Sequence, residues 1–314
     1  MSTDIVLLFP GQGSQKPGMG KDLADAFPAA RAVFEEVDAT LGAPISRLCF
    51  EGPADELTLT HNAQPALLAH GAAVWAVARE RLAGRVRAAA GHSLGEFTAY
   101  HAAGSLSLAD SASLVRRRGE LMYRTGTERP GAMGAVLGQL GTPVDDICAQ
   151  ASAEAGLVVP ANYNNAEQVV VSGEVSGVDR ALELAKAAGA KRAVRLNVSG
   201  AFHSPLMEPA VAGLREALAA RPPADPGFPV YSNVTEQPVE RGSQAAELLA
   251  RQLTSPVRWQ GLVRNIAAAY PGALFVEMGP GNVLTGLMKR IAPDATVATC
   301  GTAADVEKLL LQVA

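Results

Sequence analysis

The hydrophobic positions of this chain fall into short continuous runs and into longer segments with helical spacing. The runs at residues 5–9, 86–90 and 274–278 are mostly apolar, which is typical of strands buried on both faces of a parallel sheet. Segments in which apolar residues recur every three or four positions predict helices that pack on such a sheet. These segments cover residues 26–41, 63–82, 108–123, 206–218 and 283–291. The alternation predicts an α/β fold.

The pattern changes between residues 131 and 198. There it predicts elements in the order β-α-β-β-α-β, which is the order of ferredoxin-like domains. The predicted strands are 132–137, 157–161, 168–172 and 191–198, and the predicted helices are 144–155 and 178–188. Because α/β signals resume afterwards, we predict an inserted small subdomain at 131–198. Residues 1–130 and 199–314 then form the main domain with the parallel sheet.

One predicted strand is separated from the next helix by Gly91-His92-Ser93-Leu94-Gly95-Glu96. A strand, a Gly-x-Ser-x-Gly turn and a helix form the nucleophile-elbow pattern, in which the serine occupies a strained turn between two glycines. The amide of Leu94 would then lie at a helix N-terminus, where it could donate to an oxyanion. The alternative is that Ser93 only caps a helix, and the pentapeptide by itself does not decide between the two.

Two other polar residues follow predicted strands. Gln12 lies in a turn after strand 5–9, and such loops at the carboxyl ends of parallel strands line the active crevice of α/β proteins. His203 lies between the last strand of the insert and a helix, where it could act as a general base. Each has a plainer alternative. Gln12 could be a loop amide that bonds to the backbone, and His203 could be a surface or packing residue.

Three successive arginines, Arg116, Arg117 and Arg118, lie on the predicted helix 108–123. Neighbouring residues of a helix point about 100° apart, so the three side chains cannot share one environment. At least one of them faces the apolar side or a cleft, unless all three extend into solvent.

The composition excludes several classes of function. The 314-residue chain has 18% charged residues and a net charge of −4, so it offers no basic field to nucleic acid. Cys49, Cys148 and Cys300 lie far apart without a metal-binding spacing, which fits a reducing cytoplasm. Residues 1–10 carry an acid and a short apolar run, so we expect neither a signal peptide nor a membrane span. We expect a cytoplasmic monomer that binds no metal.

Acyl transfer needs a nucleophile and a base, and Ser93 and His203 supply both in the chain order of α/β-hydrolases. No acidic partner for the imidazole stands out, because Asp145, Asp146 and Asp179 lie on predicted helices of the insert. A backbone carbonyl could orient the imidazole instead. Such a neutral partner would stabilise an imidazolium less than a carboxylate does, which would suit a transferase.

Several further motifs occur in a fixed order along the chain. They are Gly11-Gln12-Gly13-Ser14-Gln15, the hexapeptide around Ser93, Arg118-Gly119 with Leu121-Met122, Asn164 with Gln168-Val169-Val170-Val171-Ser172-Gly173, Ala201-Phe202-His203-Ser204, Gln252 before Ser255-Pro256-Val257, and Gly279-Pro280-Gly281-Asn282-Val283-Leu284. In these motifs the chain resembles the malonyl-CoA:acyl carrier protein transacylase family of fatty acid and polyketide synthesis. The resemblance implies an α/β-hydrolase-like domain that carries a ferredoxin-like insert.

The resemblance also implies roles for individual residues. Arg118 would bind the malonyl carboxylate, and the backbone amides of Gln12 and Leu94 would form the oxyanion hole. The main-chain carbonyl of Gln252 would orient His203, which would explain the missing acid.

The resemblance bears on the acyl pocket as well. Phe202 would fill the space of an α-methyl group, and together with Leu94 it implies malonyl rather than methylmalonyl. Met122 and Tyr123 are expected in the same pocket, although Tyr123 departs from the Gln or Glu of many relatives and could also face away. Three polar residues are expected to support the site from behind: Asn162, Asn164 and His92.

The resemblance therefore implies a ping-pong acyltransferase that moves malonyl from malonyl-CoA to the phosphopantetheine thiol of an acyl carrier protein through an acyl-serine. No bound cofactor is expected, because the CoA thioester is a substrate and phosphopantetheine belongs to the carrier. The alternative is an acyl-thioester hydrolase on the same Ser93–His203 site. The pathway, fatty acid or polyketide synthesis, stays open. Candidates for a basic patch that meets an acidic carrier are Lys191, Arg192, Arg195, Lys289 and Arg290.

Overall fold

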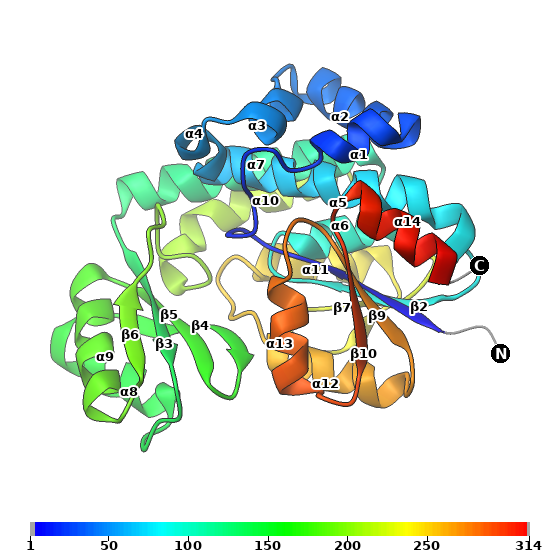
Figure 1. Ribbon diagram of the computed structural model, residues 1–314. Coiled ribbons are helices and arrows are strands. Elements are labelled where there is room, and N and C mark those ends of the chain that lie inside the picture. The colour runs from blue at the N-terminus through cyan, green and yellow to red at the C-terminus, as the bar shows by residue number, and fades with distance from the viewer. Residues whose placement is uncertain (1–3, 313–314) are drawn as a thin grey trace.

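The computed structural model describes residues 4–312 and contains two sheets, each with its own helices (Figure 1). Residues 1–3, which belong to the segment for which no signal peptide is expected, and residues 313–314 lie outside the described part. The strands of the larger sheet are β1 (Ile5–Phe9), β2 (Val86–Gly91), β7 (Val230–Tyr231), β8 (Pro238–Val239), β9 (Leu274–Met278) and β10 (Thr296–Cys300). Their order is β10-β9-β1-β2-β7-β8, and all neighbours are parallel except β7 and β8.

Side chains of β1 alternate between two hydrophobic clusters, one on each face of this sheet. Ile5 and Leu7 belong to one cluster, Val6 and Leu8 to the other, and all four are 0% exposed. The helices of the first cluster are α1 (Lys21–Ala26), α2 (Pro28–Leu41), α3 (Ile45–Glu51), α4 (Ala54–Thr58), α5 (Thr60–Leu82), α6 (Gly95–Ala102), α7 (Leu108–Glu128), α10 (Glu208–Ala220), α11 (Gly242–Arg251) and α14 (Ala303–Gln312). A 3-10 turn at Pro205–Met207 precedes α10. The second face is covered by α12 (Trp259–Ala269) and α13 (Val283–Ile291). This is the doubly covered parallel sheet that the continuous apolar runs predict.

The smaller sheet lies at the left of Figure 1. Its elements are β3 (Ala132–Leu137), α8 (Val144–Ala155), β4 (Val158–Asn165), β5 (Gln168–Gly173), α9 (Val175–Ala187) and β6 (Arg192–Arg195). The strands are antiparallel in the order β4-β5-β3-β6. Along the chain, these strands and helices follow the predicted order β-α-β-β-α-β. The domain boundaries at 131 and 198 stay a prediction.

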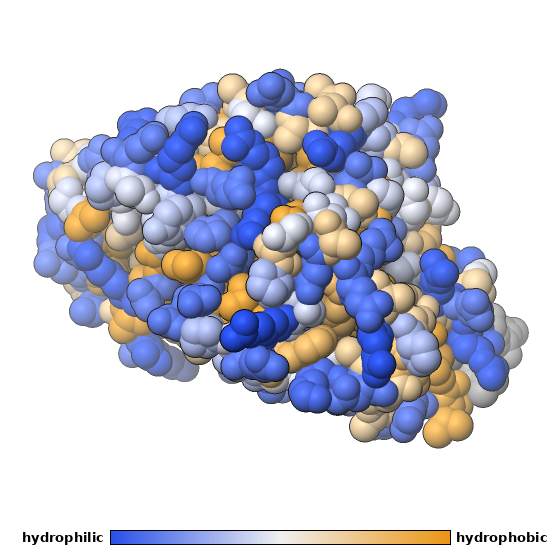
Figure 2. All heavy atoms as spheres, turned by 90° about the horizontal axis from the view of Figure 1, so that it is seen from above, coloured by the Kyte–Doolittle hydropathy of each residue, from blue (hydrophilic) through white to orange (hydrophobic). Residues whose placement is uncertain are grey.

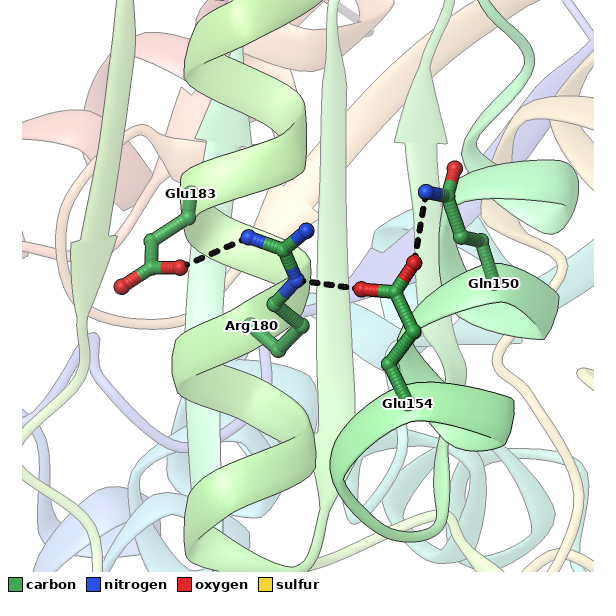
Figure 3. Close-up of polar contacts among 4 residues, drawn as sticks. All are labelled: Gln150, Glu154, Arg180 and Glu183. Atoms are coloured by element: carbon green, nitrogen blue, oxygen red, sulfur yellow. Dashed lines mark hydrogen bonds and ion pairs between the residues drawn. The ribbon is translucent and has the colours of Figure 1, made fainter.

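The two helices of the smaller sheet are joined on their outer side by a polar cluster (Figure 3). Arg180 of α9 donates to Glu154 of α8 at 2.5 Å and to Glu183 on its own helix at 3.0 Å, while Gln150 donates to the other oxygen of Glu154 at 2.8 Å. The hydrogen bonds from Gln150 and from Arg180 hold the pKa of the Glu154 carboxyl below its usual value. Because these side chains are largely in solvent, the cluster contributes little to stability.

Strand β4 of the smaller sheet is joined by main-chain hydrogen bonds to a segment that lies outside both sheets. Tyr163 N of β4 donates to Val257 O at 2.9 Å, and Val257 N donates to Ala161 O at 2.8 Å. Val257 follows α11 of the main domain, so strand β4 is paired with a segment of the other sheet's domain. We call these two bonds the cross-domain pairing.

Helix α5 begins earlier than predicted, at Thr60, and Pro65 therefore lies in its second turn. A proline there cannot donate to the carbonyl of His61. Arg116 of α7 takes over this acceptor, with Nη1 at 2.6 Å from His61 O.

The face over α1 to α4 is covered mostly by hydrophilic residues, with hydrophobic residues scattered among them (Figure 2). Within residues 4–312, no helix combines the length and apolar content that a bilayer crossing requires. The same residues contain no group of three or more His, Cys, Asp or Glu side chains arranged to hold a metal ion. Cys49, Cys148 and Cys300 are free and buried.

Candidate active site

Ser93 lies between β2 and α6 with a backbone φ of 52°, in the left-handed region that a serine rarely adopts. Its two glycine neighbours are required by close approach. A Cβ atom on Gly91 would lie 1.8 Å from the Gly95 carbonyl carbon, and one on Gly95 would lie 2.1 Å from Phe9 O. The chain therefore turns sharply against the end of β1, which is the geometry that the Gly-x-Ser-x-Gly pattern predicts.

His203 lies against Ser93, with its Nε2 at 2.7 Å from Ser93 Oγ. Its Nδ1 is 2.9 Å from the main-chain oxygen of Gln252, so the imidazole is held by a carbonyl in the place where α/β-hydrolases have a carboxylate. Burial and the nearby Arg118 cation lower the pKa of His203 to about 3. The ring is thus neutral at physiological pH and can accept a proton from Ser93.

Arg118 is a buried cation beside the nucleophile. It is 1% exposed, and its Nη2 lies 3.0 Å from Ser93 Oγ and 2.8 Å from Gln252 Oε1, while Nη1 donates to Gln64 Oε1 at 2.7 Å. Burial lowers its pKa to about 10, so it stays charged at neutral pH. Its Nε is buried without a hydrogen-bond partner in the described part of the chain. Among the three successive arginines, Arg117 is exposed and Arg116 is half-buried.

A cavity of about 400 Å³ opens over Ser93 between the two sheets. The backbone amides of Gln12 and Leu94 belong to segments that line it, and neither N–H donates a hydrogen bond to a described residue. Leu94 is the N-cap of α6, where the helix dipole favours negative charge. The wall opposite consists mainly of side chains from the smaller sheet and the loop after it. Among the lining residues are Met122, Met133, Asn162, Asn164, Val170, Phe202 and His203.

Polar residues of β4 meet the elbow from the side of the smaller sheet. His92 Nε2 lies 2.9 Å from Asn164 Oδ1, and the His92 ring lies 5.5 Å from the Trp259 ring. Asn162 Nδ2 is a more distant 3.5 Å from the same nitrogen. Asn164 Oδ1 accepts from a protonated Nε2, whereas Asn162 Nδ2 could donate only to an unprotonated one, so the shorter contact with Asn164 orients His92. The structure thus brings together all three residues that were expected behind the site.

Comparison with known proteins decides the family. Residues 6–307 match the acyl transferase domain family. The malonyl CoA-acyl carrier protein transacylase of Bacillus subtilis (strain 168) is 46% identical over 287 residues, covering 91% of this chain and 90% of that protein. This chain belongs to the malonyl CoA-acyl carrier protein transacylase family.

Solved structures of the family have the same fold. The acyl-carrier-protein S-malonyltransferase of Bartonella henselae is 44% identical, with 99% of each chain covered and a TM-score of 0.93. A malonyl-transacylase solved in complex with its type II polyketide synthase acyl-carrier protein is 38% identical, with 99% of this chain and 100% of that chain covered and a TM-score of 0.94. The prediction of the family, and of an α/β fold with a parallel sheet, is confirmed, whereas the inserted subdomain stays a prediction.

The placement of Tyr123 in the pocket is wrong, and the alternative that it faces away holds, because its side chain does not line the cavity. It is 37% exposed and packs edge-on against His61, with ring centroids 5.0 Å apart. Arg118 and Met122 are four residues apart and share one face of α7, whereas Tyr123 is turned about 100° from Met122. Any departure from other family members at this position therefore lies outside the acyl cavity.

Sequence reasoning missed three buried polar residues at the site. Gln64 binds Arg118, Asn233 accepts a hydrogen bond from Ser93 N at 2.7 Å, and Glu96 accepts one from Gln252 Nε2 at 2.7 Å. Glu96 stands inside the hexapeptide around Ser93, so its position in that motif was an available signal. Asn233 had none, because it follows the short strand β7 and is 140 residues from Ser93.

Two of the five candidate basic residues are already paired. Arg195 forms an ion pair with Asp179, and Arg290 forms one with Glu167 at 2.9 Å. Their charge is therefore partly neutralised, which weakens the case for a basic patch built on them.

Proposed function

We propose that this chain moves a malonyl group from malonyl-CoA to the phosphopantetheine thiol of an acyl carrier protein through an acyl-serine at Ser93. The observation that carries the proposal is the contact of 3.0 Å between Arg118 Nη2 and Ser93 Oγ. A buried cation next to the nucleophile selects an acyl group that brings its own carboxylate. The activity named for the Bacillus subtilis relative and the carrier complex of the polyketide relative support this substrate pair.

In the first half-reaction, His203 Nε2 takes the proton of Ser93 Oγ as the oxygen attacks the thioester carbon. The tetrahedral intermediate places its negative oxygen at the free amides of Gln12 and Leu94, which stabilise it electrostatically. When the intermediate collapses, the carbon–sulfur bond breaks and the protonated His203 gives its proton to the leaving CoA thiolate. Malonyl is then esterified to Ser93.

In the second half-reaction, the thiol of the carrier's phosphopantetheine arm loses its proton to His203 and attacks the acyl-serine. The ester bond breaks, and Ser93 Oγ recovers the proton from His203. This order is a ping-pong mechanism, and it uses no resident cofactor. Every enzyme group in it belongs to one chain, which supports action as a monomer. The three unpaired cysteines support a cytoplasmic location.

Arg118 would bind the malonyl carboxylate, and Phe202 would limit the space at the α-carbon. Phe202 is 6% exposed and lines the same cavity as Met122. A ring at this position leaves less room for an α-methyl substituent, which favours malonyl over methylmalonyl.

The test is incubation with malonyl-CoA followed by intact-mass measurement. We expect the mass of one malonyl group to be added to the wild type and nothing to be added to Ser93→Ala. A wild type that releases CoA repeatedly, beyond one equivalent per enzyme, but transfers nothing to a carrier protein would be a thioester hydrolase. A wild type that forms no adduct and releases no CoA would refute the mechanism.

A further inference from the structure

A buried carboxyl group lies directly beneath the catalytic residues and takes no part in the mechanism above. Glu96 is 0% exposed and stands in the first turn of α6. One of its oxygens, Oε2, accepts hydrogen bonds from Gln252 Nε2 at 2.7 Å and from Asn233 N at 3.1 Å. The other oxygen, Oε1, is buried without a partner in the described part of the chain.

The first of these bonds determines how Gln252 faces Arg118. The amide of Gln252 accepts from Arg118 Nη2 at 2.8 Å through Oε1, while Nε2 donates to Glu96 and, at 3.1 Å, to Ser93 O. An amide can rotate by half a turn and exchange its oxygen and nitrogen. Glu96 prevents that exchange, because its oxygen needs a donor. Arg118 is thereby held in place from below, on the side away from the cavity.

The second bond holds the segment that fixes the elbow. Asn233 Oδ1 accepts from Ser93 N at 2.7 Å, and Asn233 Nδ2 donates to Gly91 O at 2.7 Å. The two bonds reach the elbow on both sides of His92, and Asn233 is 0% exposed. They maintain the left-handed conformation of Ser93, which a serine does not adopt without support.

We propose that Glu96 is a positioning residue that holds Arg118 through Gln252 and the Ser93 elbow through Asn233. The effect of Glu96 on Arg118 is the Arg118 branch of this proposal, and its effect on the Ser93 elbow is the elbow branch. Only the Arg118 branch rests on the proposed malonyl transfer, because the elbow branch concerns the reactivity of Ser93 towards any electrophile. Burial raises the pKa of Glu96 to about 7, so both protonation states occur at physiological pH. In the protonated state the unpartnered Oε1 can carry the proton, and Oε2 still accepts both bonds.

This arrangement gives different expectations for three variants. Glu96→Gln keeps an oxygen where Oε2 accepts. Its labelling rate at Ser93 and its malonyl-to-acetyl loading ratio should therefore stay within about threefold of the wild type. Glu96→Ala removes the acceptor of Asn233 N and of one N–H of the Gln252 amide, so both the labelling rate of Ser93 and the malonyl-to-acetyl loading ratio should fall about tenfold or more. Asn233→Ala should slow only the reactivity of Ser93 by about tenfold and leave acyl selectivity unchanged. Glu208→Gln changes an exposed glutamate that begins α10 and is the control for helix-terminal charge.

Two readouts on folded protein separate the branches. The first is the rate at which a fluorophosphonate labels Ser93, and the second is the ratio of malonyl to acetyl loading from the CoA esters by timed intact-mass measurement. The proposal is overturned if folded Glu96→Ala matches the wild type, if Glu96→Gln falls as far as Glu96→Ala, or if Asn233→Ala changes the loading ratio. If Glu96→Ala does not fold, the proposal is overturned by a tenfold fall in Glu96→Gln or by a changed loading ratio in Asn233→Ala.

A failure of the proposed function would look different. Wild type that is labelled by the fluorophosphonate but takes up no malonyl would refute the substrate assignment. The labelling rates of the Glu96 and Asn233 variants would still test the elbow branch.

Discussion

Replacing Arg118 by alanine should abolish the preference for malonyl over acetyl. The guanidinium is 1% exposed, so its hydrogen bonds to a substrate carboxylate form away from water. A charge-assisted bond of this kind contributes about 1.5–3 kcal/mol. If that energy is realised in the transition state, its loss lowers the ratio of malonyl to acetyl kcat/KM by about 10- to 150-fold.

The same substitution should also lower stability. Gln64 Oε1 and Gln252 Oε1 both accept from Arg118 and would lose their donor. Each buried acceptor left without a partner costs about 1–3 kcal/mol. We therefore expect a lower melting temperature together with the loss of selectivity, and selectivity must be measured below the transition.

The assay is parallel loading from malonyl-CoA and acetyl-CoA, read by intact mass at short times. Arg117→Ala is the matched control, because this neighbour on α7 is exposed and should change neither rate. A folded Arg118→Ala variant that keeps the wild-type ratio would refute the role of this guanidinium in carboxylate binding.

Three further outcomes follow from the site. Phe202→Ala should raise methylmalonyl relative to malonyl loading by about tenfold, measured by competition between the two CoA esters, and an unchanged ratio would contradict its role in limiting the α-carbon. Because the pKa of His203 is lowered to about 3, the rate of malonyl loading measured from pH 5 to 8 should show no midpoint near 6.5. A midpoint near 6.5 that persists in Glu96→Gln would show that His203 titrates normally. The pKa of Glu96 is raised from 4.5 to about 7, so its contribution to stability is full below pH 4.5 and is lost as the pH rises through 7. Glu96→Gln should therefore remove about 2–3 kcal/mol of the decline in unfolding free energy between pH 5 and 8 in urea titrations, and an unchanged decline would show that Glu96 titrates elsewhere.

The elements with a strong local signal were predictable from sequence. The bounds predicted for β1, β3, α8, β9 and α13 agree with the structure, because each is a continuous apolar run or a regular helical pattern between turn residues. The predicted helix 26–41 corresponds to α2, which begins two residues later at Pro28 after an extended Phe27. Helix α1, which ends at Ala26, was not predicted.

The site could be predicted only where a residue stands in a recognisable motif. Ser93, Arg118 and His203 do. The structure places His203 Nε2 at 2.7 Å and Arg118 Nη2 at 3.0 Å from Ser93 Oγ. Gln64 and Asn233 act through side chains that meet their partners across 54 and 140 residues, and such contacts leave no periodic trace in the sequence. The position of Tyr123 was within reach of sequence reasoning, because helical phase alone separates it from Met122.

The cross-domain pairing restricts how substrate can enter. Val257, which bonds to Ala161 and Tyr163 of β4, lies on the segment that follows Gln252, the residue whose carbonyl holds His203. The cross-domain pairing thus holds both the segment that orients His203 and the part of the cavity wall that β4 forms. A swing of the smaller sheet away from the main domain would break it. We therefore expect both the CoA ester and the carrier arm to enter a preformed opening. The width of this opening would then select substrates by size before they react with Ser93.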